Sequence, residues 1–225
     1  MLDRSGIVRP VHGMSGNLML GDATSTDVLS SGCGPEFCLL KTDQQLLVMQ
    51  TGATPTLVRS PFPTGPAIFA FRDHTAWIYY PQDGTLTRFS DNATTNLSAP
   101  NLTGEVLSLR VTTNALEFAV RRDGTVWIER QDGALVDSLP DADGPVLLLE
   151  NAILYTSSDL VRLKRTGANT IDFPVPQVQR INTLGPRYAQ ITTADHVYAL
   201  KLDSGKGTLS QLPEPTSITR TVRRR

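Results

Sequence analysis

Short runs of alternating apolar residues recur along this chain about every 40 residues, and this repeat constrains the fold more than any other feature. The clearest unit covers residues 105–144. It holds four alternating runs, the pattern of half-buried β-strands, at residues 106–111, 116–120, 126–128 and 135–139. Asp123-Gly124 joins the second run to the third, and this dipeptide is typical of tight β-hairpins. One repeat therefore predicts four antiparallel strands.

The other repeats follow the same pattern and predict a single all-β domain. Four-stranded units at this spacing indicate a β-propeller, in which each unit is one blade around a central channel. No segment has a sustained helical period with a good N-cap, so almost no helix is expected. The predicted blades cover residues 35–65, 66–104, 105–144, 145–185 and 186–225.

The number of blades depends on the two ends of the chain. Residues 1–34 contain further short strands outside the five units. Propellers usually close their ring by pairing strands from both termini, which removes the open edges. A strand at residues 218–222 together with the N-terminal strands would supply much of a sixth blade. We therefore predict six blades closed by both termini, with five blades and an N-terminal extension as the alternative.

One family resemblance follows from the order of strands and turns. A unit such as residues 106–139 resembles the repeats of WD40- and YVTN-type bacterial β-propellers, which have a strand, an Asp or Asn turn, a second strand, Asp-Gly and two more strands. The resemblance covers most of the chain and implies the fold. No unit carries the Gly-His and Trp-Asp pairs of WD40 repeats, so no site residue of that family is carried over.

Charge and hydropathy exclude some classes of partner. The 21 basic and 22 acidic residues give a formal net charge of −1, which does not favour binding to nucleic acid. No apolar stretch approaches the roughly 18 residues of a membrane span, and the N-terminus lacks the apolar core of a secretion signal. We expect a monomer that is cytoplasmic or is a domain excised from a bacterial exported protein.

The two cysteines, Cys33 and Cys38, leave two readings open. Four residues separate them, which fits neither a redox Cys-x-x-Cys motif nor half of a zinc site. They could form a local disulfide that restrains little of the unfolded chain, or they could be free small apolar residues.

One Asp or Asn at the predicted first turn of each unit gives the most ordered polar pattern. These residues are Asp43, Asp73, Asn114, Asn151 and Asp195. A ring of such side chains around a channel mouth could bind a polar ligand or a cation such as calcium. The same residues also suit tight turns, because Asp and Asn tolerate left-handed backbone conformations.

Two histidines, His74 and His196, each follow a ring aspartate. In a six-bladed ring their blades would lie on opposite sides of the channel, too far apart to share a metal ion. We take the five ring residues and these two histidines as candidate binding residues. We predict no catalytic residue, no metal site and no cofactor.

The leading functional hypothesis is a non-catalytic propeller that presents its loops to a protein or small ligand as a binding or scaffold module. One alternative is a propeller hydrolase or lactonase with a cation in the channel. The other is a carbohydrate-binding propeller, which would need exposed aromatic residues at one mouth.

Overall fold

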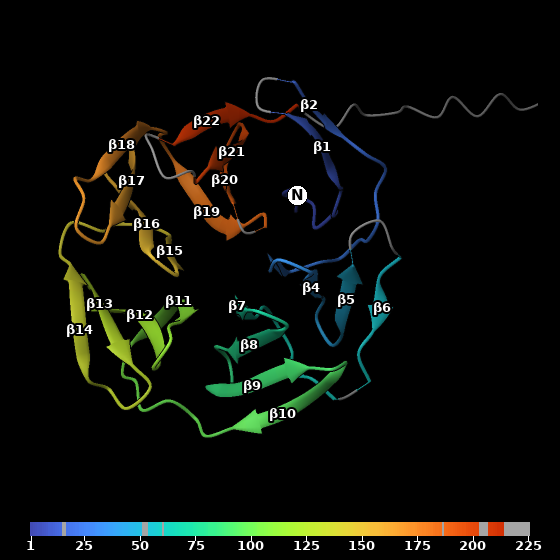
Figure 1. Cartoon of the computed structure of the whole chain (residues 1–225), viewed down its shortest axis with the longest axis horizontal. Coiled ribbons are helices and arrows are strands. Elements are labelled where there is room, and N and C mark those ends of the chain that lie inside the picture. The colour runs from blue at the N-terminus through green and yellow to red at the C-terminus, as the bar shows by residue number, and fades with distance from the viewer. Residues whose placement is uncertain (15–16, 51–53, 60, 186, 203–206, 214–225) are drawn as a thin grey trace, which may run out of the picture.

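The structure is a computed structural model that describes residues 1–14, 17–50, 54–59, 61–185, 187–202 and 207–213. These residues form β-strands and no helix. Figure 1 shows four-stranded sheets radiating around a central axis, as expected for a propeller. The all-β propeller prediction is confirmed.

The five sheets are consecutive along the chain, and the strands within each sheet pair antiparallel in sequence order. The first two blades contain β3 (Ser30–Cys33), β4 (Phe37–Lys41), β5 (Leu46–Gln50) and β6 (Thr56–Leu57), then β7 (Ile68–Arg72), β8 (Thr75–Tyr80), β9 (Thr85–Ser90) and β10 (Ala93–Leu97). The third contains β11 (Glu105–Val111), β12 (Leu116–Arg122), β13 (Thr125–Arg130) and β14 (Leu135–Leu139). The last two contain β15 (Val146–Leu149), β16 (Ala152–Ser157), β17 (Leu160–Arg165) and β18 (Ile171–Pro174), then β19 (Val178–Thr183), β20 (Tyr188–Thr193), β21 (Val197–Lys201) and β22 (Thr208–Gln211).

The described residues form five blades, the second of the two counts predicted from the sequence. The N-terminal segment does not build a sixth blade. It forms the hairpin of β1 (Val11–Met14) and β2 (Asn17–Leu20), and two isolated bridges that join Val8 to Leu2 and to Ser25. The predicted closing strand at residues 218–222 lies outside the described residues.

Two blades begin earlier along the chain than the repeat predicted. The first blade starts with β3 and the last with β19, whereas the predicted units started at residues 35 and 186. Neither strand has a clear apolar alternation: β3 reads Ser-Ser-Gly-Cys, and in β19 only Ile181 is buried. Both strands were therefore hidden from a search based on hydrophobic pattern.

The innermost strands form a closed ring. Each first strand contacts the first strands of both neighbouring blades, in the order β3, β7, β11, β15, β19 and back to β3. Hydroxyl groups bridge neighbours: the Ser30 hydroxyl accepts a hydrogen bond from the Ala67 amide at 2.9 Å, and the Ser108 hydroxyl accepts one from Leu148 at 2.9 Å. Between the last and first blades, the Cys33 amide donates to the Thr183 hydroxyl at 3.1 Å. Five strands are therefore enough to close the centre.

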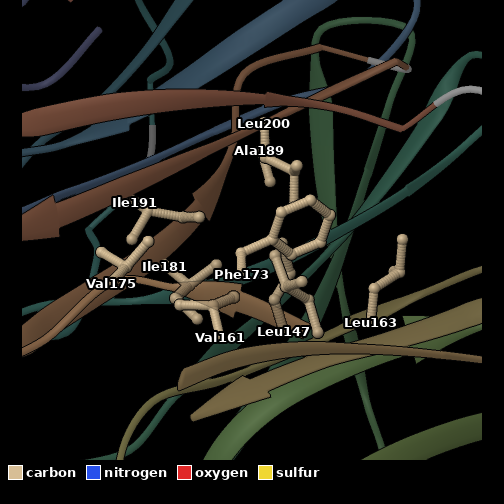
Figure 2. Packing of buried hydrophobic residues seen from close by; sticks show 10 residues of the cluster. Leu147, Val161, Leu163, Phe173, Val175, Ile181, Ala189, Ile191 and Leu200 are labelled. Carbon is tan, nitrogen blue, oxygen red and sulfur yellow. The ribbon is translucent and has the colours of Figure 1, made fainter. Parts of the chain in front are cut away.

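Apolar clusters fill the spaces between neighbouring blades. Four clusters join the first blade to the second, the second to the third, and so on to the fifth. Figure 2 shows the cluster between the fourth and fifth blades, where the Phe173 ring lies among Leu147, Ala189 and Leu200. Burial of apolar side chains in these clusters stabilises the ring, because neighbouring sheets share their covered faces.

The N-terminal segment is a wedge between the last blade and the first. On one side, Leu2, Val8 and Val28 pack against Leu40 of the first blade. On the other side, Met1 packs against Ala199 and Leu212 of the last blade. The buried Gln190 side chain also accepts a hydrogen bond from the Leu2 amide at 3.1 Å and donates one to the Leu2 carbonyl at 2.6 Å. The wedge therefore replaces a direct apolar contact between these two blades.

Tyr79 and Tyr80 face opposite sides of the second blade, as neighbouring residues of a strand do. Tyr79 belongs to the cluster shared with the third blade, and Tyr80 to the cluster shared with the first. Burial raises the pKa of the fully buried Tyr80 to about 12, and its hydroxyl lies near that of Thr87 without forming a hydrogen bond of good geometry.

This pKa predicts a loss of stability in alkaline solution. Between about pH 10 and pH 12 the unfolded chain ionises Tyr80 while the folded protein keeps it neutral, so the folded state binds more protons and the free energy of unfolding falls as pH rises. From about pH 10 to pH 12 the free energy of unfolding should fall by about 3 kcal/mol in total. Urea unfolding from pH 9 to 12 measures it. Tyr80→Phe should reduce this slope, and an unchanged slope would show that Tyr80 does not cause it.

Candidate functional site at the first-turn mouth

The turns of the blades gather at two ends of the channel. We call the turn between the first and second strands of a blade its first turn, and the next one its second turn. Because successive strands of a blade alternate in direction, first and second turns lie at opposite ends. We refer to these ends as the first-turn mouth and the second-turn mouth.

Two arginines tie neighbouring blades together at the first-turn mouth. Arg72, the last residue of β7, donates a hydrogen bond of 2.6 Å to the Thr112 carbonyl in the first turn of the next blade. Arg110 in β11 donates in the same way to the Leu149 carbonyl of the fourth blade at 3.2 Å. Arg110 is also paired with the buried Glu117 at 2.7 Å, so its charge is neutralised within the wall. These contacts hold the first turns in fixed positions.

A cavity of about 920 Å³ opens at the first-turn mouth and is lined by all five blades. Its apolar wall includes Phe69, Phe71, Leu109 and Leu148, and its charged residues are Arg72, Asp73, Arg110, Glu150 and Arg165. Concave sites with an apolar wall and a few polar groups are the usual form of ligand and peptide sites. The arrangement can therefore hold a group that is partly apolar and partly charged.

The rim of this mouth includes a contact between the first two blades. The Nδ1 atom of His74, in the first turn of the second blade, lies against the carboxylate of Glu36, in the first turn of the first blade. Both side chains are more than half exposed. Beneath this rim, Gly34 lies against the Phe71 ring, where an added Cβ would come within 2.7 Å of a ring carbon.

The structure joins Cys33 and Cys38 in a disulfide. They are directly opposite each other in the β3–β4 hairpin, and Cys33 lines the channel cavity. Of the two readings left open by the sequence, the disulfide is the one that the structure has.

The seven candidate residues from the sequence do not lie together. Asp73, Asn114, Asn151 and His74 are in first turns, and Asp73 and Asn151 line the channel cavity. Asp43, Asp195 and His196 are in second turns at the opposite mouth, because the first and last blades begin one strand earlier than the repeat indicated. The structure therefore brings together only part of the predicted ring.

Asp43 has partners within the protein at the second-turn mouth. Its carboxylate accepts a hydrogen bond from the Gly65 amide at 3.0 Å, and the buried Lys41 side chain donates to its carbonyl at 2.7 Å. Burial lowers the pKa of Lys41 from its ordinary value, and the Asp43 charge opposes that shift. A second cavity of about 640 Å³ lies here, lined by Asp43, Arg180 and the N-terminal wedge.

His196 and His74 lie at opposite ends of the channel. His196 is near the side-chain amide of Gln211, with 3.1 Å between Nδ1 and Nε2, and its ring forms a T-shaped pair with the Tyr198 ring. Within the described ranges, no three His, Cys, Asp or Glu side chains are close enough together to hold a metal ion. The expectation of no metal site and no cofactor stays a prediction from the sequence, as does its alternative of calcium at the turn ring.

Apart from Asp73 and Asn151, sequence reasoning missed the residues that line the channel cavity. Arg72 and Arg110 occupy equivalent places near the ends of β7 and β11, and their spacing matches the repeat. That periodic arginine was a usable signal. Sequence reasoning also missed that all the second turns carry an exposed aspartate: Asp43, Asp83, Asp123, Asp159 and Asp195.

Comparisons with known proteins support the fold. No protein-family model matches the chain, and no curated protein matches it either. A chain of the nidogen–laminin complex is similar with a TM-score of 0.62 at 10% identity, over 92% of this chain and 93% of that one. PorZ of the type-IX secretion system of Porphyromonas gingivalis is similar with a TM-score of 0.56 at 15% identity, over 93% of this chain but 36% of PorZ.

Hsv2 of Kluyveromyces lactis has a TM-score of 0.53 at 10% identity, over 83% of this chain and 64% of that one. This chain thus spans about a third of PorZ and less than two thirds of Hsv2. At these identities the likeness shows the β-propeller fold alone. In the described part of the chain, no helix could cross a membrane.

Proposed function

We propose that this chain is a non-catalytic binding domain that engages a protein partner at the first-turn mouth. The observation that carries the proposal is the channel cavity of about 920 Å³, because all five blades contribute to its wall. Turns can vary in sequence while the sheets beneath them keep their positions, so such a mouth suits recognition.

The chemistry of the mouth supports a protein partner. Its apolar wall can cover an aromatic or aliphatic side chain, and its rim offers Glu150, Asn151 and Asp73 as polar contacts. An apolar centre with a polar rim is the usual composition of a protein interface. A similar fold occurs in the nidogen–laminin complex, which is an assembly of two proteins.

Matched substitutions at the two mouths test the proposal. Glu150→Lys and Asn151→Arg place large charges on exposed positions of the first-turn mouth, and Asp83→Lys and Asp159→Lys do so at the second-turn mouth. Each protein is cross-linked in cells that make it, and the captured proteins are identified by mass spectrometry. We expect a specific partner with the unmodified chain and the second-turn variants, reduced at least tenfold with the first-turn variants.

Equal capture by both pairs of variants would overturn the choice of mouth. Turnover of ester, lactone or glycoside substrates by the purified chain would overturn the non-catalytic assignment.

A further inference from the structure

The charged residues that line the channel cavity differ in how far they reach into solvent. The Asp73 side chain is 82% exposed, and Glu150 is also exposed. The Arg72 and Arg110 side chains are only 33% and 15% exposed, and Arg165 is half-buried. The lining contains both signs of charge, but the charge that a visitor from solvent meets first is negative.

The arginines of this lining are already engaged within the protein. Arg110 is paired with Glu117 at 2.7 Å, and Arg72 donates a hydrogen bond of 2.6 Å to the Thr112 carbonyl. Arg165 also interacts with another part of the chain. These guanidinium groups therefore hold the wall together, and their positive charge is partly or fully used there.

Glu150 differs from these residues because no described residue hydrogen-bonds or pairs with its carboxylate. Asp73 lies 3.8 Å from the Nε atom of the neighbouring Arg72, and an exposed pair of this kind contributes little. Glu150 directly follows Leu149, whose carbonyl accepts the hydrogen bond of 3.2 Å from Arg110. The backbone beside Glu150 is therefore held in place, which lowers the ordering cost when a cation binds there.

An apolar surface lies next to this free carboxylate. Phe71, Val111 and Leu149 come from three successive blades, line the cavity and are half-buried, so part of each side chain still faces water. A large apolar side chain that covers them would remove this surface from water, which favours association. An occupant that suits the site should therefore carry an apolar group and a cation close together.

We propose that the partner presents a lysine or arginine beside a large apolar side chain, and that Glu150 selects this cation; the inference rests on the protein-binding function proposed above. The apolar side chain covers Phe71, Val111 and Leu149, and the cation pairs with the Glu150 carboxylate, with Asp73 as a second anion nearby. Opposite charges across an interface set its specificity and its association rate, and a partner with an acidic residue at this point is disfavoured by repulsion.

Selection of peptides tests the chemistry of the occupant. Short random peptides displayed on phage are selected on the purified chain, and those that bind the Asn151→Trp variant equally well are discarded. Asn151 is exposed and lines the cavity, and tryptophan is large and uncharged, so this filter keeps peptides that need the mouth without favouring either charge. We expect the retained peptides to be enriched in lysine or arginine beside phenylalanine, leucine or methionine.

The outcomes of this selection separate the inference from the proposed function. Retained peptides that are enriched in acidic residues, or that are apolar without a basic residue, would overturn the proposed chemistry and leave binding at the first-turn mouth intact. A selection that retains no peptide would overturn both.

A charge swap tests the role of Glu150. One retained basic peptide, and the same peptide with its basic residue changed to glutamate, are titrated by fluorescence anisotropy. Glu150→Gln should weaken the basic peptide about fivefold and reduce the effect of added salt on its affinity. Asp159→Asn, in the second turn of the fourth blade, is the matched control and should leave the affinity unchanged. Glu150→Lys should reverse the preference, so that the glutamate peptide binds more tightly.

An affinity that Glu150→Gln leaves unchanged, or a preference that Glu150→Lys does not reverse, would overturn the assignment of Glu150.

Discussion

Replacing Phe173 with alanine should cost the largest share of stability of any single side-chain truncation discussed for this molecule. Phe173 is 8% exposed, and its ring joins the fourth blade to the fifth among Leu147, Ala189 and Leu200 (Figure 2). Truncating a buried phenylalanine typically costs about 3–5 kcal/mol, because burial is lost and a cavity remains. Urea unfolding followed by tryptophan fluorescence should show this loss in the free energy of unfolding. Thermal unfolding should show a Tm lower by roughly 10 °C.

The control for this substitution is Leu135→Ala on the outer strand of the third blade. Leu135 is 59% exposed, so its truncation should change the free energy of unfolding by no more than about 0.5 kcal/mol. A loss below about 1 kcal/mol for Phe173→Ala would contradict the packing described between the fourth and fifth blades.

Gly104→Ala should be nearly as damaging although it adds a single methyl group. Gly104 has a φ of +122°, and an added Cβ would lie 2.5 Å from the Arg121 carbonyl oxygen, which belongs to the backbone and cannot turn away. Strain at such a backbone conformation and the clash each cost about 1–3 kcal/mol, so we expect a total of about 3 kcal/mol or more. Urea unfolding of the purified variant measures it.

Gly124→Ala separates the cost of backbone strain from the cost of the clash. Gly124 also has a positive φ, +77°, but no atom lies within 4 Å of its added Cβ. It should therefore cost only the conformational penalty of about 1–2 kcal/mol. Equal losses at the two positions would mean that the contact between Gly104 and Arg121 is absent in solution.

Turn chemistry made the third blade predictable from the sequence. Its predicted runs overlap all four observed strands, and the run at residues 135–139 coincides with β14. Asp123 and Gly124 both have positive φ, as the Asp-Gly hairpin requires. Local residue preference and the buried pattern agree in this blade, so the sequence is informative there.

The inner strands of the first and last blades were not predictable in this way. In β3 the close approach of the second blade requires a small residue: an added Cβ at Gly32 would lie 2.8 Å from the Phe69 Cβ, so glycine stands where the apolar pattern would place a larger side chain. In β19 four of the six residues are polar and only Ile181 is buried. A search for alternating apolar runs cannot detect either strand.

The first and last predicted blades began one strand too late, and this error also explains why the site was predicted only in part. A residue such as Asp43 is assigned to one mouth or the other by counting strands from the start of its blade. The missing β3 and β19 therefore moved Asp43, Asp195 and His196 to the opposite mouth, while Asp73, Asn114 and Asn151 were placed at the correct turns. The cavity wall depends on contacts between blades about 40 residues apart, such as the one from Arg72 to Thr112, and these are not visible in local patterns.

The closure of a five-strand inner ring between the last and first blades is tested most directly by nuclear Overhauser effects in the isotope-labelled full chain. The account predicts cross-peaks between the Cys33 amide and the Thr183 side chain, whose oxygen lies 3.1 Å from that amide nitrogen. Absence of these cross-peaks, with the β3 residues showing contacts to a further inner strand in place of β19, would contradict a ring closed by five blades.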